Sequence, residues 1–98
     1  MKIEKKLNGS SLEVAVEGRL DTMTAPELEK ELKDCLKGVK ELIFDFGKLE
    51  YVSSAGLRVL LIAQRSMEYG GKMRVRNANE LICEVFEVTG FADIITVE

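Results

Sequence analysis

The residues best suited to carry chemistry are two adjacent serines, Ser53 and Ser54, which precede Ala55 and Gly56. An apolar stripe at helical spacing follows them, so the pair lies at a predicted helix start. Backbone N–H groups at such a start lack helical acceptors, and the helix dipole is positive there. A serine in this position can cap the helix, act as a nucleophile, or accept a phosphoryl group.

Composition argues against the nucleophile. The chain has 98 residues and no histidine, so it lacks Ser-His-Asp and Cys-His triads, His-ligated metal sites and the usual general base near neutral pH. The serines are not part of a G-x-S-x-G elbow, and no G-x-x-x-x-G-K-[ST] phosphate loop occurs. We therefore expect no enzyme and no bound cofactor, whereas the cap and phosphoacceptor roles stay open and are compatible.

Charge and apolar patterning limit the partners and the compartment. The 14 basic and 17 acidic residues give a formal charge of -3, without the basic patch that holds nucleic acid. No run approaches the roughly 18 apolar residues of a membrane span, and no apolar core follows Met1 as in a signal peptide. We expect a cytoplasmic protein that binds neither nucleic acid nor a bilayer directly.

The two cysteines, Cys35 and Cys83, lie far apart and outside any CxxC motif. Both fall on apolar faces of predicted helices. We expect them to fill the core, not to bind metal or form a redox pair.

The elements that must position the serines begin with a hairpin. Residues 3–7 and 12–16 alternate between apolar and polar around Asn8-Gly9, which predicts two antiparallel strands. The charged first strand suits a sheet edge, where charge discourages pairing with another chain. A free edge nevertheless leaves room for weak association.

A helix is expected to follow, with unusually complete start signals. Thr24 and Glu27 match a capping box, and Met23 and Leu28 occupy the positions of a hydrophobic staple. Gly38 is a natural stop.

The remaining elements alternate strand and helix. Residues 41–46 read as a central strand, 47–52 as a loop, and the helix that starts at the serines is expected to end at Gly70-Gly71. A strand over 72–76, a helix capped by Asn77 or Asn79 and ending at Gly90, and a marginal strand over 94–97 complete the chain.

The element order ββαβαβα(β) predicts one α/β domain over residues 1–98. Its sheet should be mixed but mostly parallel, with four to five strands, an N-terminal antiparallel hairpin and about three helices mainly on one face. In open α/β sheets, functional residues gather at the carboxyl ends of parallel strands. The segments 18–24 and 49–57 therefore compete for that role.

With this order, two segments carry a resemblance to a known family. They are Gly18-Arg19-Leu20-Asp21 and the run Tyr51-Val52-Ser53-Ser54-Ala55-Gly56-Leu57-Arg58-Val59-Leu60-Leu61. The second is similar to the D-S-[ST]-G-L segment of STAS-domain proteins of the anti-sigma factor antagonist type. The resemblance covers essentially the whole chain.

The resemblance implies a phosphorylation switch. Such proteins, when unmodified, bind an anti-sigma factor that is also an ATP-dependent serine kinase, and so free the sigma factor. The kinase then phosphorylates a serine, which releases the antagonist, and a serine phosphatase resets it. Alignment on Gly56 makes Ser54 the phosphoacceptor, with Ser53 as the fallback, and the kinase would bring the ATP.

The resemblance also implies a contact surface for the partner. Its expected members are Asp21, Thr22, Ser53, Ser54, Gly56, Leu57 and Arg58. From the residues alone, Asp21 reads equally well as a turn acid at the helix entry, and Leu57 as core.

Ser53 departs from the family, which usually carries aspartate at this position. The change removes one fixed negative charge beside the acceptor and adds a second hydroxyl. It leaves an alternative open, in which the domain is a constitutive adaptor subunit of a transport or signalling complex without a phosphorylation switch.

Overall fold

The structure is a computed structural model that describes residues 1–67 and 71–98. Its strands and helices have the predicted order: β1 (Lys2–Asn8), β2 (Ser11–Leu20), α1 (Ala25–Cys35), β3 (Glu41–Val52), α2 (Ser54–Ser66), β4 (Lys72–Arg76), α3 (Glu80–Val88) and β5 (Thr96–Val97), with a 3-10 turn, η1 (Phe91–Asp93), before β5. The α/β fold class, the leading hairpin and the three helices are therefore confirmed.

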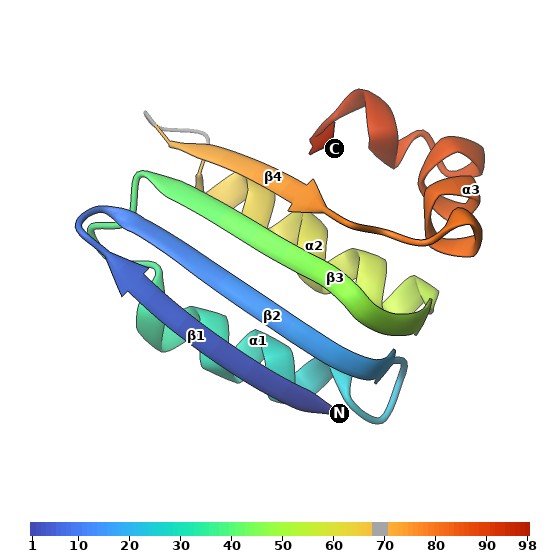
Figure 1. The fold of residues 1–98 in the computed structure, drawn as a ribbon, viewed down its shortest axis with the longest axis horizontal. Coiled ribbons are helices and arrows are strands. Elements are labelled where there is room, and N and C mark those ends of the chain that lie inside the picture. Colours follow the sequence, from blue (N-terminus) through green and yellow to red (C-terminus); the bar gives the residue numbers. More distant parts are fainter. Residues whose placement is uncertain (68–70) are drawn as a thin grey trace.

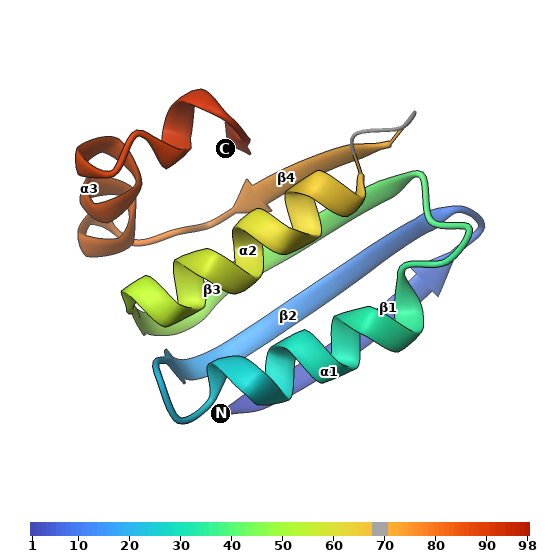
Figure 2. The same cartoon turned by 180° about the vertical axis from the view of Figure 1, so that it is seen from behind.

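The five strands form one mixed sheet in the order β1-β2-β3-β4-β5. Only β1 runs antiparallel to its neighbour, and the other three pairings are parallel. The helices α1 and α2 lie side by side on one face, as expected, and α3 lies past the end of β4 (Figures 1 and 2). Within the described residues, no helix covers the opposite face of the sheet.

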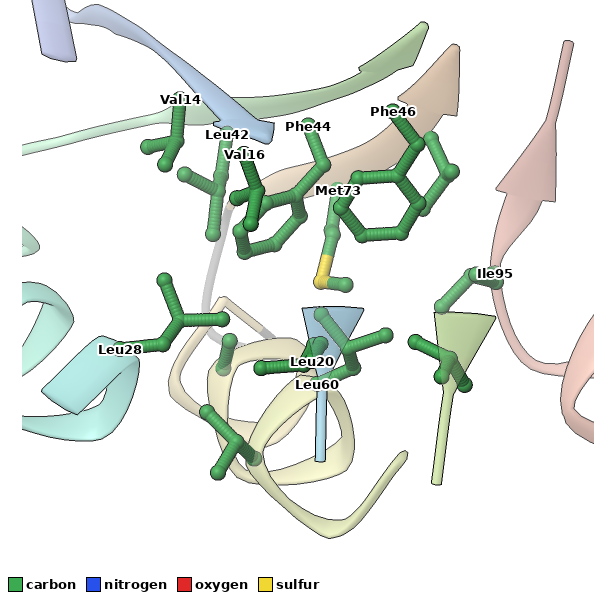
Figure 3. Close-up of a cluster of buried hydrophobic side chains, with 14 of the residues drawn as sticks. Val14, Val16, Leu20, Leu28, Leu42, Phe44, Phe46, Leu60, Met73 and Ile95 are labelled. Atoms are coloured by element: carbon green, nitrogen blue, oxygen red, sulfur yellow. The ribbon is translucent and has the colours of Figure 1, made fainter. Parts of the chain in front are cut away.

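The core lies between the sheet and this helical layer (Figure 3). Helix-facing strand residues such as Val14, Phe44 and Val75 are fully buried, and they belong to one hydrophobic cluster with Leu28 of α1 and Leu60 of α2. No polar or charged side chain is buried within residues 1–67 and 71–98. Burial of apolar surface, at about 25 cal/mol per Å², is thus the force that holds the two helices on the sheet.

The loop predicted over residues 47–52 is wrong, because β3 continues through it to Val52. Leu49 and Val52 are buried, and the extension pairs with the second half of β2 as far as Leu20. The two strands stay paired through two register shifts, between Ala15 and Glu17 and between Gly18 and Arg19. Gly18 has φ +102°, which an L side chain rarely adopts, so this glycine permits the second irregularity.

Several element ends also differ from the expectation. Helix α2 ends at Ser66, whereas its end was predicted at Gly70-Gly71. Gly70 lies outside the described residues. Asn79, not Asn77, caps α3, since its Oδ1 accepts from the Ile82 N–H at 2.8 Å. The last strand is shorter than predicted, because the N–H groups of Ile94 and Ile95 donate back to the Phe91 carbonyl oxygen in the 3-10 turn before β5.

The expectation that both cysteines fill the core is only partly right. Cys35 and Cys83 are free thiols and half-buried. Lys5 Nζ lies 3.2 Å from Cys35 Sγ, and Cys83 Sγ lies 3.6 Å from the Ala78 carbonyl oxygen. Both therefore sit at the margin of the core.

Candidate functional site

Two helix starts meet at the carboxyl ends of β2 and β3. Leu20, the last residue of β2, pairs with Val52, the last residue of β3, and its carbonyl oxygen accepts from the Ser53 N–H at 2.9 Å. The segments that enter α1 and α2 are thereby held next to each other. The two segments that the sequence offered as competitors form one surface.

At the start of α2, the two serines have different roles. Ser53 is the N-cap: its backbone is extended, and its Oγ accepts from the Gly56 N–H at 3.2 Å. Ser54 is the first helical residue and is exposed, and its hydroxyl makes no hydrogen bond to the residues that the structure describes. The sequence did not say which serine caps the helix. In the structure Ser53 is the cap and Ser54 has the free hydroxyl.

The environment of the free hydroxyl favours negative charge. The N–H groups of Ser54 and Ala55 have no helical acceptor, because they lie in the first turn. The first turn of α2 holds no acidic residue, so nothing on the helix itself offsets its positive end.

Gly56 sets the distance between α2 and β2. A Cβ at Gly56 would lie 2.7 Å from Leu20 Cγ and 2.9 Å from the Leu20 carbonyl oxygen, closer than real contacts allow. Gly56 is buried, so its part in the surface is to let the helix approach the strand. Leu57 is half-buried against the core, whereas Arg58 is exposed.

The start of α1 is closed by its own side chains. Asp21 Oδ1 accepts from the N–H groups of Met23 at 3.0 Å and Thr24 at 3.1 Å. The Thr24 hydroxyl accepts from the Asp21 N–H at 2.9 Å and donates to the Arg19 carbonyl oxygen at 2.8 Å. The backbone N–H of Thr24, followed by that of Met23, holds the pKa of Asp21 below its usual range.

This arrangement corrects the predicted capping box and staple. Thr24 occupies the N-cap position but makes no capping hydrogen bond of its own, since its hydroxyl turns back to Arg19. Met23 is 87% exposed and cannot staple the helix to buried Leu28. Asp21 organises the turn instead, while Thr22 beside it is exposed.

Sequence reasoning missed three residues beside the site. The Arg19 guanidinium lies 4.6 Å from the centre of the Tyr51 ring and 3.9 Å from Asp21 Oδ2, which links the two strand ends across the surface. Met23 adds an exposed apolar side chain next to Asp21. The sequence shows a cationic, an aromatic and an apolar side chain at these positions, but only the β2–β3 pairing brings Arg19 to Tyr51.

A groove of about 230 Å³ also opens beside Ser54, between α2 and the C-terminal segment. Its lining residues are Ser54, Leu57, Arg58, Leu61, Thr89, Phe91 and Ile94. The sequence shows the apolar residues Phe91 and Ile94 after Gly90, but only the tertiary fold brings them to α2. A larger groove of about 530 Å³ lies between α1 and α2 and contains none of the predicted site residues.

No cluster of three or more metal-ligating side chains occurs in the part of the chain that the structure describes. Within the same residues, no helix is long and apolar enough to cross a membrane.

Comparison with known proteins places this geometry in a family. The model of the STAS domain matches residues 2–98. BtrV of Bordetella bronchiseptica, assigned as an anti-sigma factor antagonist, is 35% identical over 94% of this chain and 80% of its own length. The anti-sigma-B factor antagonist of Bacillus subtilis is 26% identical over 97% of this chain and 88% of its own.

Solved structures agree at the level of the fold. The anti-sigma factor antagonist SpoIIAA in its unphosphorylated form matches with a TM-score of 0.79 at 16% identity, over 99% of this chain and 87% of that one. Its phosphorylated form, from Bacillus, matches with a TM-score of 0.78 at 17% identity, over 99% and 91%.

Proposed function

The chain belongs to the STAS-domain family, and we propose that it is an anti-sigma factor antagonist switched by phosphorylation of Ser54. The unphosphorylated form binds an anti-sigma factor serine kinase and thereby frees the sigma factor in the cytoplasm. The kinase transfers the γ-phosphoryl group of ATP to Ser54 Oγ, and the modified chain is released. A serine phosphatase restores the hydroxyl.

One observation carries the choice of residue: Ser54 is exposed with a free hydroxyl, whereas Ser53 Oγ is engaged with the Gly56 N–H. A kinase can reach Ser54 without breaking the cap of α2. Phosphoryl transfer to Ser53 would have to displace the hydrogen bond that caps α2, which is worth about 1 kcal/mol.

The contact surface proposed for the kinase surrounds Ser54. Arg58 lies one helical turn along α2 and shares the groove with Ser54 and Leu57. Asp21 and Thr22 lie on the adjacent turn, which Asp21 itself rigidifies. A rigid turn beside an exposed helix end lets a partner bind with little ordering of this chain.

The switch would act locally. A phosphate adds about -1.5 to -2 charges at pH 7 to a chain whose formal charge is -3. At the first position of α2 this charge suits the helix dipole, so the fold should persist while the partner meets new charge and bulk.

The first test is phosphate mapping. The protein is incubated with ATP and its cognate serine kinase anti-sigma factor, and the site is located by mass spectrometry. Ser54→Ala should abolish incorporation, while Ser53→Ala, the matched control, should retain it. Absence of phosphate from both serines with a verified partner would refute the switch.

The second test is binding. Ser54→Asp should weaken kinase binding about a hundredfold, close to 3 kcal/mol, while Ser54→Ala should bind like the unmodified chain. Equal binding by both variants would support the adaptor function, which needs a partner surface but no switch.

A further inference from the structure

The edge of the sheet at β1 has a pattern that the proposed function does not use. On one side, β1 pairs with β2, and on the other side no strand follows within the described residues. Leu7 on this edge is 65% exposed, which is high for a leucine on the helix-bearing face. The opposite edge, β5, offers only two residues.

We propose that β1 binds a second copy of this chain through β1 of that copy, antiparallel, with the two-fold axis at Lys5. The dimer would carry one continuous ten-stranded sheet. Edge pairing of this kind adds main-chain hydrogen bonds, and the side chains that face each other select the register.

Face matching limits the registers to a few. Lys2, Glu4 and Lys6 lie on the open face, because their partners in β2 are Glu17, Ala15 and Glu13. Ile3, Lys5 and Leu7 lie on the helix face, opposite buried Val16, Val14 and Leu12. Residues directly opposite each other in an antiparallel pair point to the same face of the sheet. A two-fold axis normal to the sheet must therefore lie midway between the two copies of one residue.

An axis at Ile3 would set Lys2 opposite Glu4 twice, but it would pair only residues 1–5 and leave exposed Leu7 without a partner. The axis at Lys5 gives complementary pairs over most of the strand. It sets Glu4 opposite Lys6 of the other copy twice, and Ile3 opposite Leu7 twice. An axis at Glu4 would instead oppose two glutamates and set Lys2 against Lys6, and an axis at Lys6 would oppose two lysines and set Lys5 against Leu7. Opposite charges across a strand pair stabilise it, and like charges destabilise it.

Two lysines do meet at the axis, but each is already neutralised within its own chain. Lys5 Nζ forms an ion pair with Glu31 on α1 and lies 3.2 Å from Cys35 Sγ. Its charge is therefore directed to the helix and away from the strand edge. Glu4 pairs with Lys2 at 3.3 Å, but both side chains are about two-thirds exposed, so Glu4 can also take a second partner.

The contact is small, since it joins seven-residue strands and lacks the area of a stable dimer. We expect a dissociation constant of about 0.1 mM, and a chain that remains monomeric at about 1 mM overturns the proposal. The measurement is sedimentation equilibrium of the purified chain, and no kinase is required, so its outcome is independent of the proposed switch.

A charge exchange tests the register. Glu4→Lys and Lys6→Glu should each weaken the dimer at least tenfold, because each sets like charges opposite one another twice. The double variant restores opposite charges and should return to within about threefold of the original constant. Glu87→Lys, at an exposed position of α3, changes net charge as Glu4→Lys does and should leave the dimer intact.

Either single variant dimerising like the parent, or the double variant failing to recover, overturns the register. A second measurement does not depend on variants. In a sample mixed from two isotope labellings, methyl contacts between Ile3 of one copy and Leu7 of the other should appear. Within one strand these residues are about 13 Å apart, too far for such a contact. A dimer without it uses another surface, and the proposal fails.

Discussion

The starts of α1 and α2 satisfy their free backbone N–H groups in different ways. At α1, the carboxylate of Asp21 holds two N–H groups and the Thr24 hydroxyl is turned back to Arg19, so the polar groups are satisfied internally. At α2, Ser53 alone supplies the cap, and Ser54 is left exposed with a free hydroxyl. The start of α1 is held by its own side chains, whereas the start of α2 leaves one hydroxyl exposed.

The difference teaches where a modification can be accepted. A phosphate on Thr24 would break a hydrogen-bonded turn, whereas one on Ser54 would disrupt no hydrogen bond of the described residues. Position at a helix start is shared by both segments, so it does not by itself identify the acceptor. The separation of cap and free hydroxyl at α2 is the observation that supports Ser54 as the acceptor in the proposed switch.

The largest effect on this comparison should come from Gly56→Ala. The new methyl group would press on Leu20, including its carbonyl oxygen at 2.9 Å, and would push α2 away from the end of β2. Overpacking outweighs the better helix propensity of alanine, and we expect a loss of about 2 kcal/mol in the free energy of unfolding in urea.

Gly47→Ala is the matched control for that variant. Its Cβ would meet side-chain atoms, Asp45 Oδ1 at 3.2 Å and Asn77 Cβ at 3.6 Å, and a side chain can shift where a backbone cannot. We expect a change within about 0.5 kcal/mol. Equal losses of unfolding free energy in the two variants would mean that a Cβ at Gly56 fits against Leu20 without overpacking.

A smaller effect should separate the two serines. Ser53→Ala removes the cap and should lower the free energy of unfolding by about 1 kcal/mol. Ser54→Ala removes an exposed hydroxyl and should stay within about 0.5 kcal/mol of the parent. The same urea titration measures both, and the reverse order would assign the cap to Ser54 and undo the division of roles.

Much of the fold was predictable because local signals agreed with it. The Asn8-Gly9 turn, the apolar run 42–46 and the helical stripes gave the order of the elements directly. The second half of β3 was not predictable in this way. Gly47, Lys48 and Glu50 are exposed, and what keeps this stretch extended is its pairing with the end of β2 across two irregularities.

The site was predictable as a place, but not in its internal arrangement. The serines and Asp21 lie at the carboxyl ends of β2 and β3, in the two segments that the sequence offered as competing candidates. Which serine caps depends on where helical geometry begins, and a shift of one residue exchanges the roles. At α1, Thr24 and Glu27 fit the capping pattern, but the carboxylate of Asp21, three residues before Thr24, takes the N–H groups first.

The smallest predicted effect is a difference in pH dependence between the two starts. The N–H groups of Thr24 and Met23 lower the pKa of Asp21 in the folded chain, so its contribution to stability is fully present above the unfolded pKa of about 3.9 and is lost as pH falls through the folded value. The gap in stability between the parent and Asp21→Asn should therefore narrow from about pH 7 to about pH 3. The gap between the parent and Ser53→Ala should stay constant over the same range, since a hydroxyl does not titrate there. Urea unfolding at both pH values measures the two gaps, and an Asp21 gap that does not narrow would mean that the turn at α1 does not depend on a carboxylate.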